Sequence, residues 1–152
     1  PRAPYASGLD GLIMRVSSGG VLQWYTFVGS AGTDTIAMAY EDSDQSILFC
    51  GNAAGNIAAM NGVTPYLSYN ANYDLLYGRM NSDGTVKWYN FIGTSGSDSS
   101  GAIAITKDGG LMVGGHASGP VSSLFGKSPL IGYSGGSGGD LFLAKFKPDG
   151  RF

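Results

Sequence analysis

WYTFVGSAGTD, at residues 24–34, returns almost unchanged as WYNFIGTSGSD at residues 88–98. The second stretch lies 64 residues after the first, and the chain aligns with itself at this separation without a gap for nearly a whole unit. The shared positions are aromatic residues, glycines and aspartates, so the two stretches agree in chemistry as well as in spacing. Agreement of this length indicates an internal repeat, and a repeat constrains the overall architecture more strongly than any single predicted strand.

A third copy opens near the end of the sequence, where DLFLAKFKPDG corresponds to DLLYGRMNSDG of the second copy. The repeat therefore divides the chain into four parts. They are the end of a connector (1–9), a first blade-type unit with its connector (10–73), a second unit with its connector (74–139) and the opening strand of a third unit (140–152).

Each unit contains four apolar runs of strand length, separated by turns rich in Gly, Ser and Asp. The runs are 12–16, 21–28, 36–40 and 47–50 in the first unit, 75–80, 85–92, 102–106 and 111–113 in the second, and 141–146 in the third. Short apolar runs joined by such turns are typical of antiparallel strands. The pattern predicts one four-stranded antiparallel sheet from the four runs of each unit.

The strands are apolar on both faces. Side chains alternate in direction along a strand, so Leu76 and Met80 point to one face while Leu75 and Tyr77 point to the other. A sheet of this kind must be covered on both sides, and because no segment has a helical period, the remaining cover is a sister sheet. The sequence therefore predicts an all-β fold of four-stranded antiparallel β-propeller blades, with two complete units plus the first strand of a third.

The repeated tryptophans, Trp24 and Trp88, are predicted to fill the gap between neighbouring sheets. A stacking platform for a sugar ring is the alternative use of such a side chain. Gly78 and Ala144 stand where the first unit has Met14, and small residues suit a crowded inner strand.

The composition excludes several classes of partner. Charged residues make up 13% of the chain and the net charge is -2, whereas nucleic-acid and anionic-membrane binding need clustered Lys and Arg. No run of 18 apolar residues predicts a transmembrane helix, and no signal peptide is recognisable. Cys50 is the only cysteine, so an intrachain disulfide cannot form.

Residues suited to chemistry are few and scattered. His116, the only histidine, has no distinguishable nucleophile and carboxylate beside it, and we interpret it as a polar residue leaving a strand. One His and one Cys do not make a zinc site. Calcium is an alternative use of four turn aspartates, although such residues more commonly bond their own backbone; they are Asp34, Asp42, Asp44 and Asp98. We predict no catalytic, cofactor-binding or metal-binding residue.

Two further patterns are interpreted as structural. GYSGGSGGD at 132–140 precedes a strand rather than a helix, so it is predicted to be a connector and not a phosphate-binding loop. Arg15, Arg79 and Lys145 each follow a recurring aspartate by five residues. This odd separation places cation and carboxylate on opposite faces of a strand, so we expect each cation to reach a neighbouring sheet or solvent.

The order of these motifs resembles the bacterial β-propeller repeats called SBBP-type repeats. The matching segments are DLFLAKFKPDG (140–150), WYNFIGTSGSD (88–98) and AIAITKDGGLMVGG (102–115). The resemblance covers nearly the whole chain and departs from the family pattern in the first unit, where EDSDQS replaces the usual Asp-Gly turn. It implies a secreted or surface-exposed bacterial scaffold, with no shared set of catalytic residues.

Our leading hypothesis is a non-catalytic scaffold made of propeller repeats, acting through protein partners or further copies of itself. Two blades leave apolar faces open, so the count favours a piece of a longer protein, with assembly of several copies as the alternative. A second hypothesis is a glycan-binding module that uses connector tyrosines, namely Tyr66, Tyr69, Tyr73 and Tyr133. A third is a hydrolase or lyase whose site lies in missing blades. Function in propellers concentrates where blades differ, here in EDSDQS (41–46) and the connectors 52–73 and 116–139.

Overall fold

The structure, a computed structural model, describes residues 1–121, 123–136 and 138–152. These residues contain no helix and form nine β-strands. The strands are β1 (Gly11–Val16), β2 (Leu22–Val28), β3 (Thr35–Glu41), β4 (Ile47–Ala53), β5 (Asp74–Met80), β6 (Val86–Ile92), β7 (Ser99–Ile105), β8 (Leu111–Ala117) and β9 (Asp140–Phe146). Each of the nine predicted apolar runs is a strand, so the predicted all-β class and the strand positions are confirmed.

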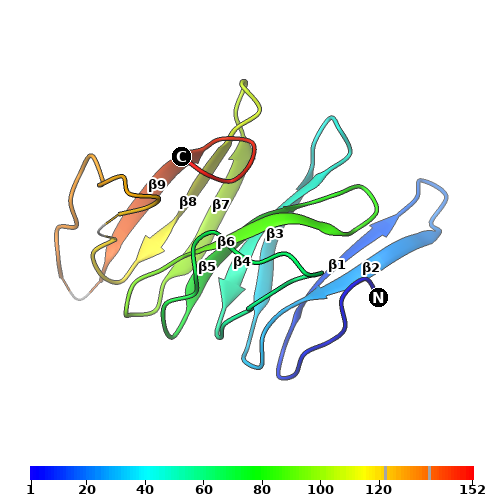
Figure 1. Cartoon of the computed structure of the whole chain (residues 1–152), viewed down its shortest axis with the longest axis horizontal. Helices are drawn as coiled ribbons and strands as arrows, with labels where there is room; N and C mark the ends of the chain where they lie inside the picture. The colour runs from blue at the N-terminus through cyan, green and yellow to red at the C-terminus, as the bar shows by residue number, and fades with distance from the viewer. Residues whose placement is uncertain (122, 137) are drawn as a thin grey trace.

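In the described part of the chain the strands form three antiparallel sheets, of two, four and three strands. Sheet 1 contains β1 and β2, sheet 2 has the order β3-β4-β5-β6, and sheet 3 has the order β7-β8-β9. Figure 1 shows them following one another in a row, from β1 and β2 on the right to β9 on the left. The described residues form an open row of sheets, and closure into a propeller remains a prediction.

The predicted grouping of strands within a unit is wrong. The four-stranded sheet takes β3 and β4 from residues 10–73 and β5 and β6 from residues 74–139. The cause is that the outer edge of the second strand of each unit is already occupied. The Phe27 amide donates to the Ala3 carbonyl at 3.4 Å, and the Phe91 amide donates to the Leu67 carbonyl at 3.2 Å. The third strand therefore cannot pair there and begins the next sheet.

The buried apolar side chains form two separate clusters, one between sheets 1 and 2 and the other between sheets 2 and 3. Leu75 and Leu76 are both 0% exposed, although they point to opposite faces of β5. Leu76 belongs to the cluster between sheets 1 and 2, while Leu75 belongs to the cluster between sheets 2 and 3. The prediction that sister sheets cover both sides of a sheet is thus confirmed for sheet 2.

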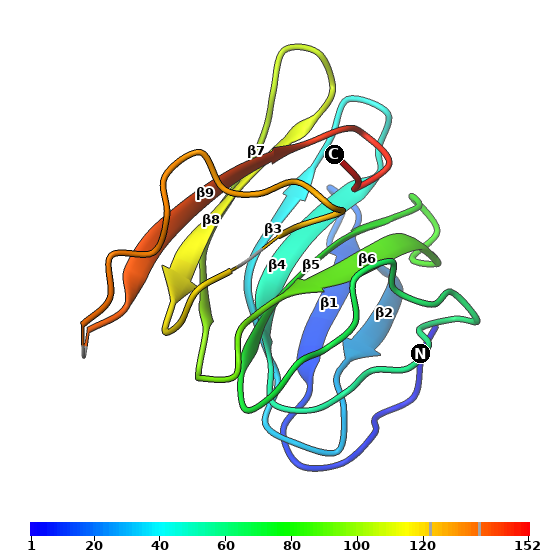
Figure 2. The ribbon, with the colours of Figure 1, turned by 60° about the vertical axis from the view of Figure 1, so that its left-hand side comes forward.

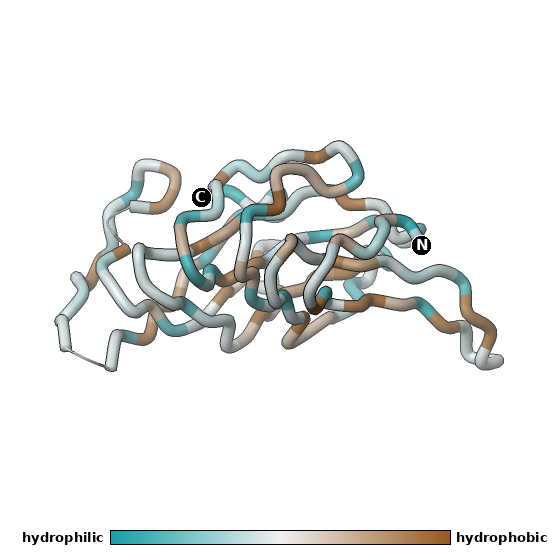
Figure 3. The backbone as a smooth tube through the Cα atoms, turned by 90° about the horizontal axis from the view of Figure 1, so that it is seen from below, coloured by the Kyte–Doolittle hydropathy of each residue, from teal (hydrophilic) through white to brown (hydrophobic). Residues whose placement is uncertain are grey.

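The distribution of apolar residues extends beyond these two clusters. Figure 3 shows hydrophobic residues through the body of the molecule and again in the β1–β2 hairpin at its right-hand end. No helix in the described part of the chain combines the length and apolar character needed to cross a membrane.

Candidate functional site

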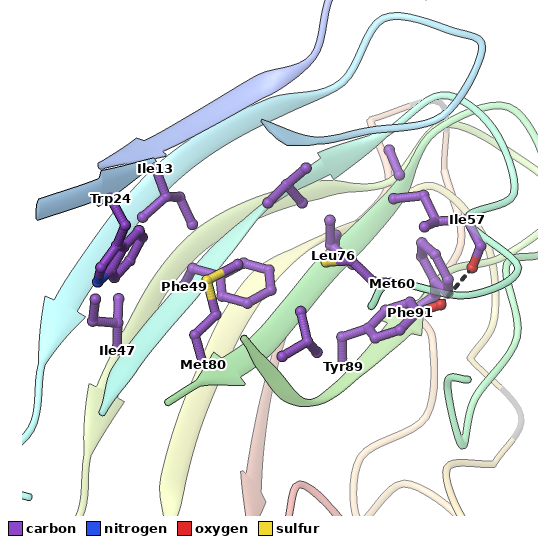
Figure 4. Close-up of a cluster of buried hydrophobic side chains, with 13 residues drawn as sticks. Ile13, Trp24, Ile47, Phe49, Ile57, Met60, Leu76, Met80, Tyr89 and Phe91 are labelled. Carbon is purple, nitrogen blue, oxygen red and sulfur yellow. Dashed lines mark hydrogen bonds between the residues drawn. The ribbon is translucent and has the colours of Figure 1, made fainter. Parts of the chain in front are cut away.

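The contact between sheets 1 and 2 is built around Trp24. Its ring packs with Ile13, Ile47 and Phe49 in a buried cluster (Figure 4). The indole Nε1–H donates to the Ser82 carbonyl at 2.9 Å, in the turn that joins β5 to β6. Tryptophan therefore supplies both apolar area and one directed hydrogen bond between the sheets, as expected for an aromatic side chain with a polar atom.

The contact between sheets 2 and 3 repeats this arrangement with Trp88. Its Nε1–H donates to the Pro148 carbonyl at 3.2 Å, again in the turn after the next unit's first strand. The ring lies against Gly150, where an added Cβ would stand 2.6 Å from Cε3, so this turn needs glycine for space. Gly150 also has φ of 81°, which suits glycine. The prediction that the tryptophans fill the gap between sheets is confirmed at both positions.

A polar link accompanies the second contact. The Asn52 side chain, at the end of β4, accepts a hydrogen bond from the Ser100 amide of β7 at 2.6 Å.

The structure also explains the small residue at Gly78, because an added Cβ would lie 2.8 Å from Cε1 of the buried Phe49. Ala144, at the corresponding place on β9, is buried in the second cluster.

Beyond these two contacts, each end of the row presents an uncovered apolar surface. We call the outer surface of sheet 1 the front face; its residues are between 45 and 53% exposed. They are Leu12, Met14, Val16 and Leu22. On β9 of sheet 3, Leu141 and Leu143 are 87 and 70% exposed, and together they form the rear face. Contiguous apolar patches of this kind mark interaction surfaces.

The two exposed faces occupy the same repeat positions as the two faces buried inside the row. The counterparts of Leu12 and Val16 are Leu76 and Met80, both 0% exposed in the first cluster. The counterparts of Leu141 and Leu143 are two residues of β5 that are 0% exposed in the second cluster; these are Leu75 and Tyr77. The front and rear faces are therefore the two halves of the contact that already holds the sheets together.

The four aspartates considered for calcium make hydrogen bonds and ion pairs within the protein. The buried Asp98 carboxylate accepts the Thr94 amide at 2.5 Å and the Ser118 amide at 2.8 Å, which ties two chain segments to one turn. Asp34 does the same in the first unit, with the Ser30 and Ala54 amides at 2.6 and 2.9 Å. Among the described residues no group of three or more His, Cys, Asp or Glu side chains is placed to hold a metal ion.

The variable turn EDSDQS uses its carboxylates for ion pairs. Asp42 pairs with Arg79 of β5, and Asp44 lies 3.7 Å from Nζ of Lys87. Arg15 instead reaches the next sheet, where it donates to the Ser82 carbonyl at 2.9 Å. Arg15 and Arg79 each reach the neighbouring repeat unit, as expected, although Arg79 and its partner Asp42 lie in the same sheet.

Nζ of Lys145 lies 2.7 Å from Asp108 of the same sheet, and this side chain is 54% exposed, so it also reaches solvent as expected. In both sheets the partner carboxylate lies in the turn that leads into the strand paired with the strand of the cation; the partners are Asp42 before β4 and Asp108 before β8. Arg15 also forms an ion pair with Glu41 of sheet 2, at 3.2 Å.

His116 closes the connector that leads into β9. Its Nε2 contacts the Gly138 carbonyl, which joins the end of β8 to this connector. The Ser134 hydroxyl donates to Asp140 at 2.7 Å. The connector predicted at 132–140 thus folds back on β8 and β9; the part of it at Ser137, like Ser122 earlier in the same connector, lies outside the described residues.

The connector tyrosines divide into two kinds. Tyr69 packs edge-to-face on Phe91 with ring centroids 5.8 Å apart, and Tyr133 donates to the Ser118 carbonyl at 3.2 Å. Tyr66 and Tyr73 are exposed. The structure therefore gives half of the four predicted sugar-stacking residues a role in holding connectors in place.

The buried carboxyl group of Asp74 has a raised pKa, which can be tested in solution. Its side chain is 0% exposed, and burial raises its pKa from 3.8 to about 6, against the opposing effect of the Asn70 and Ala71 amides. The Asn70 amide donates to Oδ2 at 2.5 Å, while Oδ1 has no hydrogen-bond partner within the described structure. Gly93 leaves space for this carboxyl group, because an added Cβ there would overlap it.

Cys50 provides a test of whether sheets 2 and 3 separate in solution. The thiol is fully buried between them, and burial raises its pKa to about 11. Because the thiolate is the reactive form, we expect no reaction with Ellman's reagent at pH 8 in native buffer and one thiol per chain in 8 M urea. Stoichiometric labelling of the native chain within the mixing time would contradict the packing described here.

No protein-family model and no curated protein matches the chain. The resemblance to SBBP-type propeller repeats therefore rests on the sequence motifs and remains a prediction. The sequence led us to expect open apolar faces, but it did not identify the residues of the front and rear faces or the unpartnered Oδ1 atom of Asp74. The repeat alignment contained a signal for the two faces, since it pairs each of their residues with a buried counterpart.

Proposed function

We propose that the chain is a non-catalytic scaffold that works by protein–protein contact, through stacking of its end sheets on sister sheets. One observation carries the proposal. The front and rear faces are the repeat counterparts of the two sides of the contact that the molecule buries internally. The front face of one chain can therefore pack against the rear face of another.

The chemistry of the two faces supports contact with a second copy of this chain. Leu12, Met14 and Val16 offer exposed apolar side chains, while Leu141 and Leu143 offer exposed aliphatic side chains on the opposite end sheet. Front-to-rear contact is heterologous, so repeated association gives a ring if the rotation closes and a filament if it does not. Propellers close with about four to eight blades, which a small number of copies would supply.

The resemblance to SBBP-type repeats adds a setting. Proteins with such repeats are secreted or exposed on bacterial surfaces, and we extend this localisation to the present chain as part of the proposal. The low fraction of charged residues, 13%, suits a protein whose surface is partly reserved for contact with sister sheets.

Native mass tests the scaffold proposal. We expect sedimentation equilibrium of the purified chain to give a multiple of 15.7 kDa that falls towards the single-chain mass on dilution. Met14→Glu on the front face or Leu143→Glu on the rear face places an unpaired charge in the contact and should weaken association at least about tenfold. Leu9→Glu, at an exposed apolar position outside both faces, is the matched control and should change nothing.

A folded chain that sediments at 15.7 kDa at every concentration would contradict the proposal. So would an oligomer that both face variants leave intact. Circular dichroism of each variant establishes that it is folded before its mass is compared.

A further inference from the structure

The connector between β4 and β5 covers the outer edge of β6. The Leu67 carbonyl accepts a hydrogen bond from the Phe91 amide, and the Tyr66 and Leu67 amides donate to the Asn90 side chain at 2.9 and 3.1 Å. Figure 2 shows this green connector beside β6 on its way to the start of β5. We call residues 66–73 the edge strip. In the described part of the chain the edge strip takes the place of a further strand on β6.

The end of the edge strip is anchored on the carboxyl group of Asp74. Oδ2 accepts a hydrogen bond from the Asn70 amide at 2.5 Å, and the Ala71 amide also bonds this carboxyl group. On its other side the carboxyl group lies against Gly93, where an added Cβ would overlap it. The carboxyl group thus joins the edge strip to the loop that follows β6.

The surroundings of this carboxyl group disfavour a negative charge. The group is fully buried, and its Oδ1 atom has no hydrogen-bond donor among the described residues. The titratable groups on the elements packed around it are Asp98 from the loop before β7, Tyr69 and Tyr73 from the edge strip, and Asp34 from the loop before β3. None of these side chains carries a positive charge. Burial of a carboxylate without a cation or a full set of donors is costly, so the protonated form is favoured.

The third repeat copy holds the corresponding carboxyl group differently. The Ser134 hydroxyl donates to Oδ1 of Asp140 at 2.7 Å, whereas the same atom of Asp74 has no donor within the described structure. Asp140 is also only half-buried. The pKa of Asp140 is lowered, mainly by its hydrogen bonds from Ser134, while burial raises the pKa of Asp74 to about 6. The second copy therefore combines full burial with a missing donor.

We propose that the carboxyl group of Asp74 is a proton-operated latch, which holds the edge strip on β6 while it is protonated and loosens the strip when it is ionised. Release of the strip lets water reach the carboxylate, so the released form has the ordinary pKa of 3.8 while the docked form has a pKa of about 6. Since the docked form binds the proton more tightly, a rise in pH favours release. The equilibrium constant for release should increase roughly 50-fold between pH 4 and pH 7. The latch lies within one chain and does not depend on the proposed assembly of copies.

Hydrogen–deuterium exchange, read by mass spectrometry on peptides that cover the edge strip, tests the latch. Each exchange rate is divided by the intrinsic rate at the same pH, which gives a protection factor. We expect the protection factor of the edge strip to fall roughly 50-fold from pH 4 to pH 7 in the unaltered chain. Asp74→Asn carries no charge and should keep the protection factor constant, whereas Asp140→Asn should leave the fall in place. Peptides from β4 should be better protected than the edge strip at every pH, because local opening needs less free energy than global unfolding.

Protection of the edge strip that stays constant from pH 4 to pH 7 in the unaltered chain would overturn the latch, and this comparison needs no variant to fold. A fall that persists in the Asp74→Asn chain would assign the effect to another group and overturn it equally. Equal protection of the edge strip and β4 would show that the strip is released only by global unfolding, which also rejects a latch. The mass measurements concern the front and rear faces, so either proposal can fail while the other stands.

Discussion

Replacing Trp88 with alanine lowers the free energy of unfolding by about 3–5 kcal/mol. The indole is 5% exposed, it packs edge-to-face on Tyr77 at 5.9 Å, and it donates to the Pro148 carbonyl of the next sheet. Truncation removes this area, leaves a cavity between sheets 2 and 3 and orphans the carbonyl. Urea unfolding followed by far-UV circular dichroism measures the loss, with an unchanged m-value expected if both forms unfold in one step.

Trp88→Phe is the matched control because it keeps most of the ring volume and loses the Nε1–H. It should cost markedly less than alanine, with about 1 kcal/mol of the loss due to the hydrogen bond. A loss below about 1 kcal/mol for Trp88→Ala would show that the two sheets do not depend on this side chain. The Cys50 thiol gives an independent reading, since it should become reactive at lower urea in the alanine variant.

The strands themselves could be predicted from the sequence because their apolar runs have the length and the flanking turns of antiparallel strands. The burial of Leu75 and Leu76 on opposite faces followed from side-chain alternation alone, and so did the need for a sister sheet on each side. Trp24 and Trp88 were placed correctly for the same reason, since a repeated large aromatic residue in a two-sided sheet has to lie between sheets.

The division of strands among sheets was predicted wrongly, because local spacing favours the other grouping. A short turn joins β2 to β3 and a long connector joins β4 to β5, so spacing alone favours pairing β2 with β3. The backbone bonds from Phe27 and Phe91 to the connector decide otherwise, and they depend on how a distant segment returns to the edge.

The recurring aspartates show a second limit. Asp10, Asp74 and Asp140 hold one position in the repeat and would be assigned one environment from sequence. Only Asp74 is fully buried, with the Asn70 amide and Gly93 against its carboxyl group, whereas Asp10 and Asp140 are half-buried. The pKa of Asp140 is lowered, mainly by its hydrogen bonds from Ser134, whereas that of Asp74 is raised. The local packing and hydrogen bonds of each copy therefore set the pKa of its aspartate, and the repeat alignment does not show them.

Asp74→Asn abolishes a loss of stability that the unaltered chain shows between about pH 4 and pH 6. The folded chain holds the Asp74 proton up to about pH 6, whereas the unfolded chain releases it near 3.8. Since the folded state binds more protons in this interval, the free energy of unfolding falls as the pH rises through it. The difference in pKa corresponds to about 3 kcal/mol, most of which is lost by pH 7.

Asparagine keeps an acceptor oxygen for the Asn70 amide and carries no charge to bury. The variant should therefore match the unaltered chain in pH slope below about pH 4 and exceed it in stability by up to about 3 kcal/mol above pH 7. Urea midpoints at unit intervals from pH 4 to pH 8 measure this. Asp140→Asn, at the same repeat position with a lowered pKa, should leave the fall between pH 4 and pH 6 in place.

A pH slope that survives in Asp74→Asn would mean that another group is responsible and that the Asp74 carboxyl is solvated in solution. Solvation of that carboxyl requires the packing around it to open, because Gly93 and the connector segment of Asn70 and Ala71 lie against it. The titration of one buried acid therefore reports whether the connector that precedes β5 stays packed against this sheet in solution.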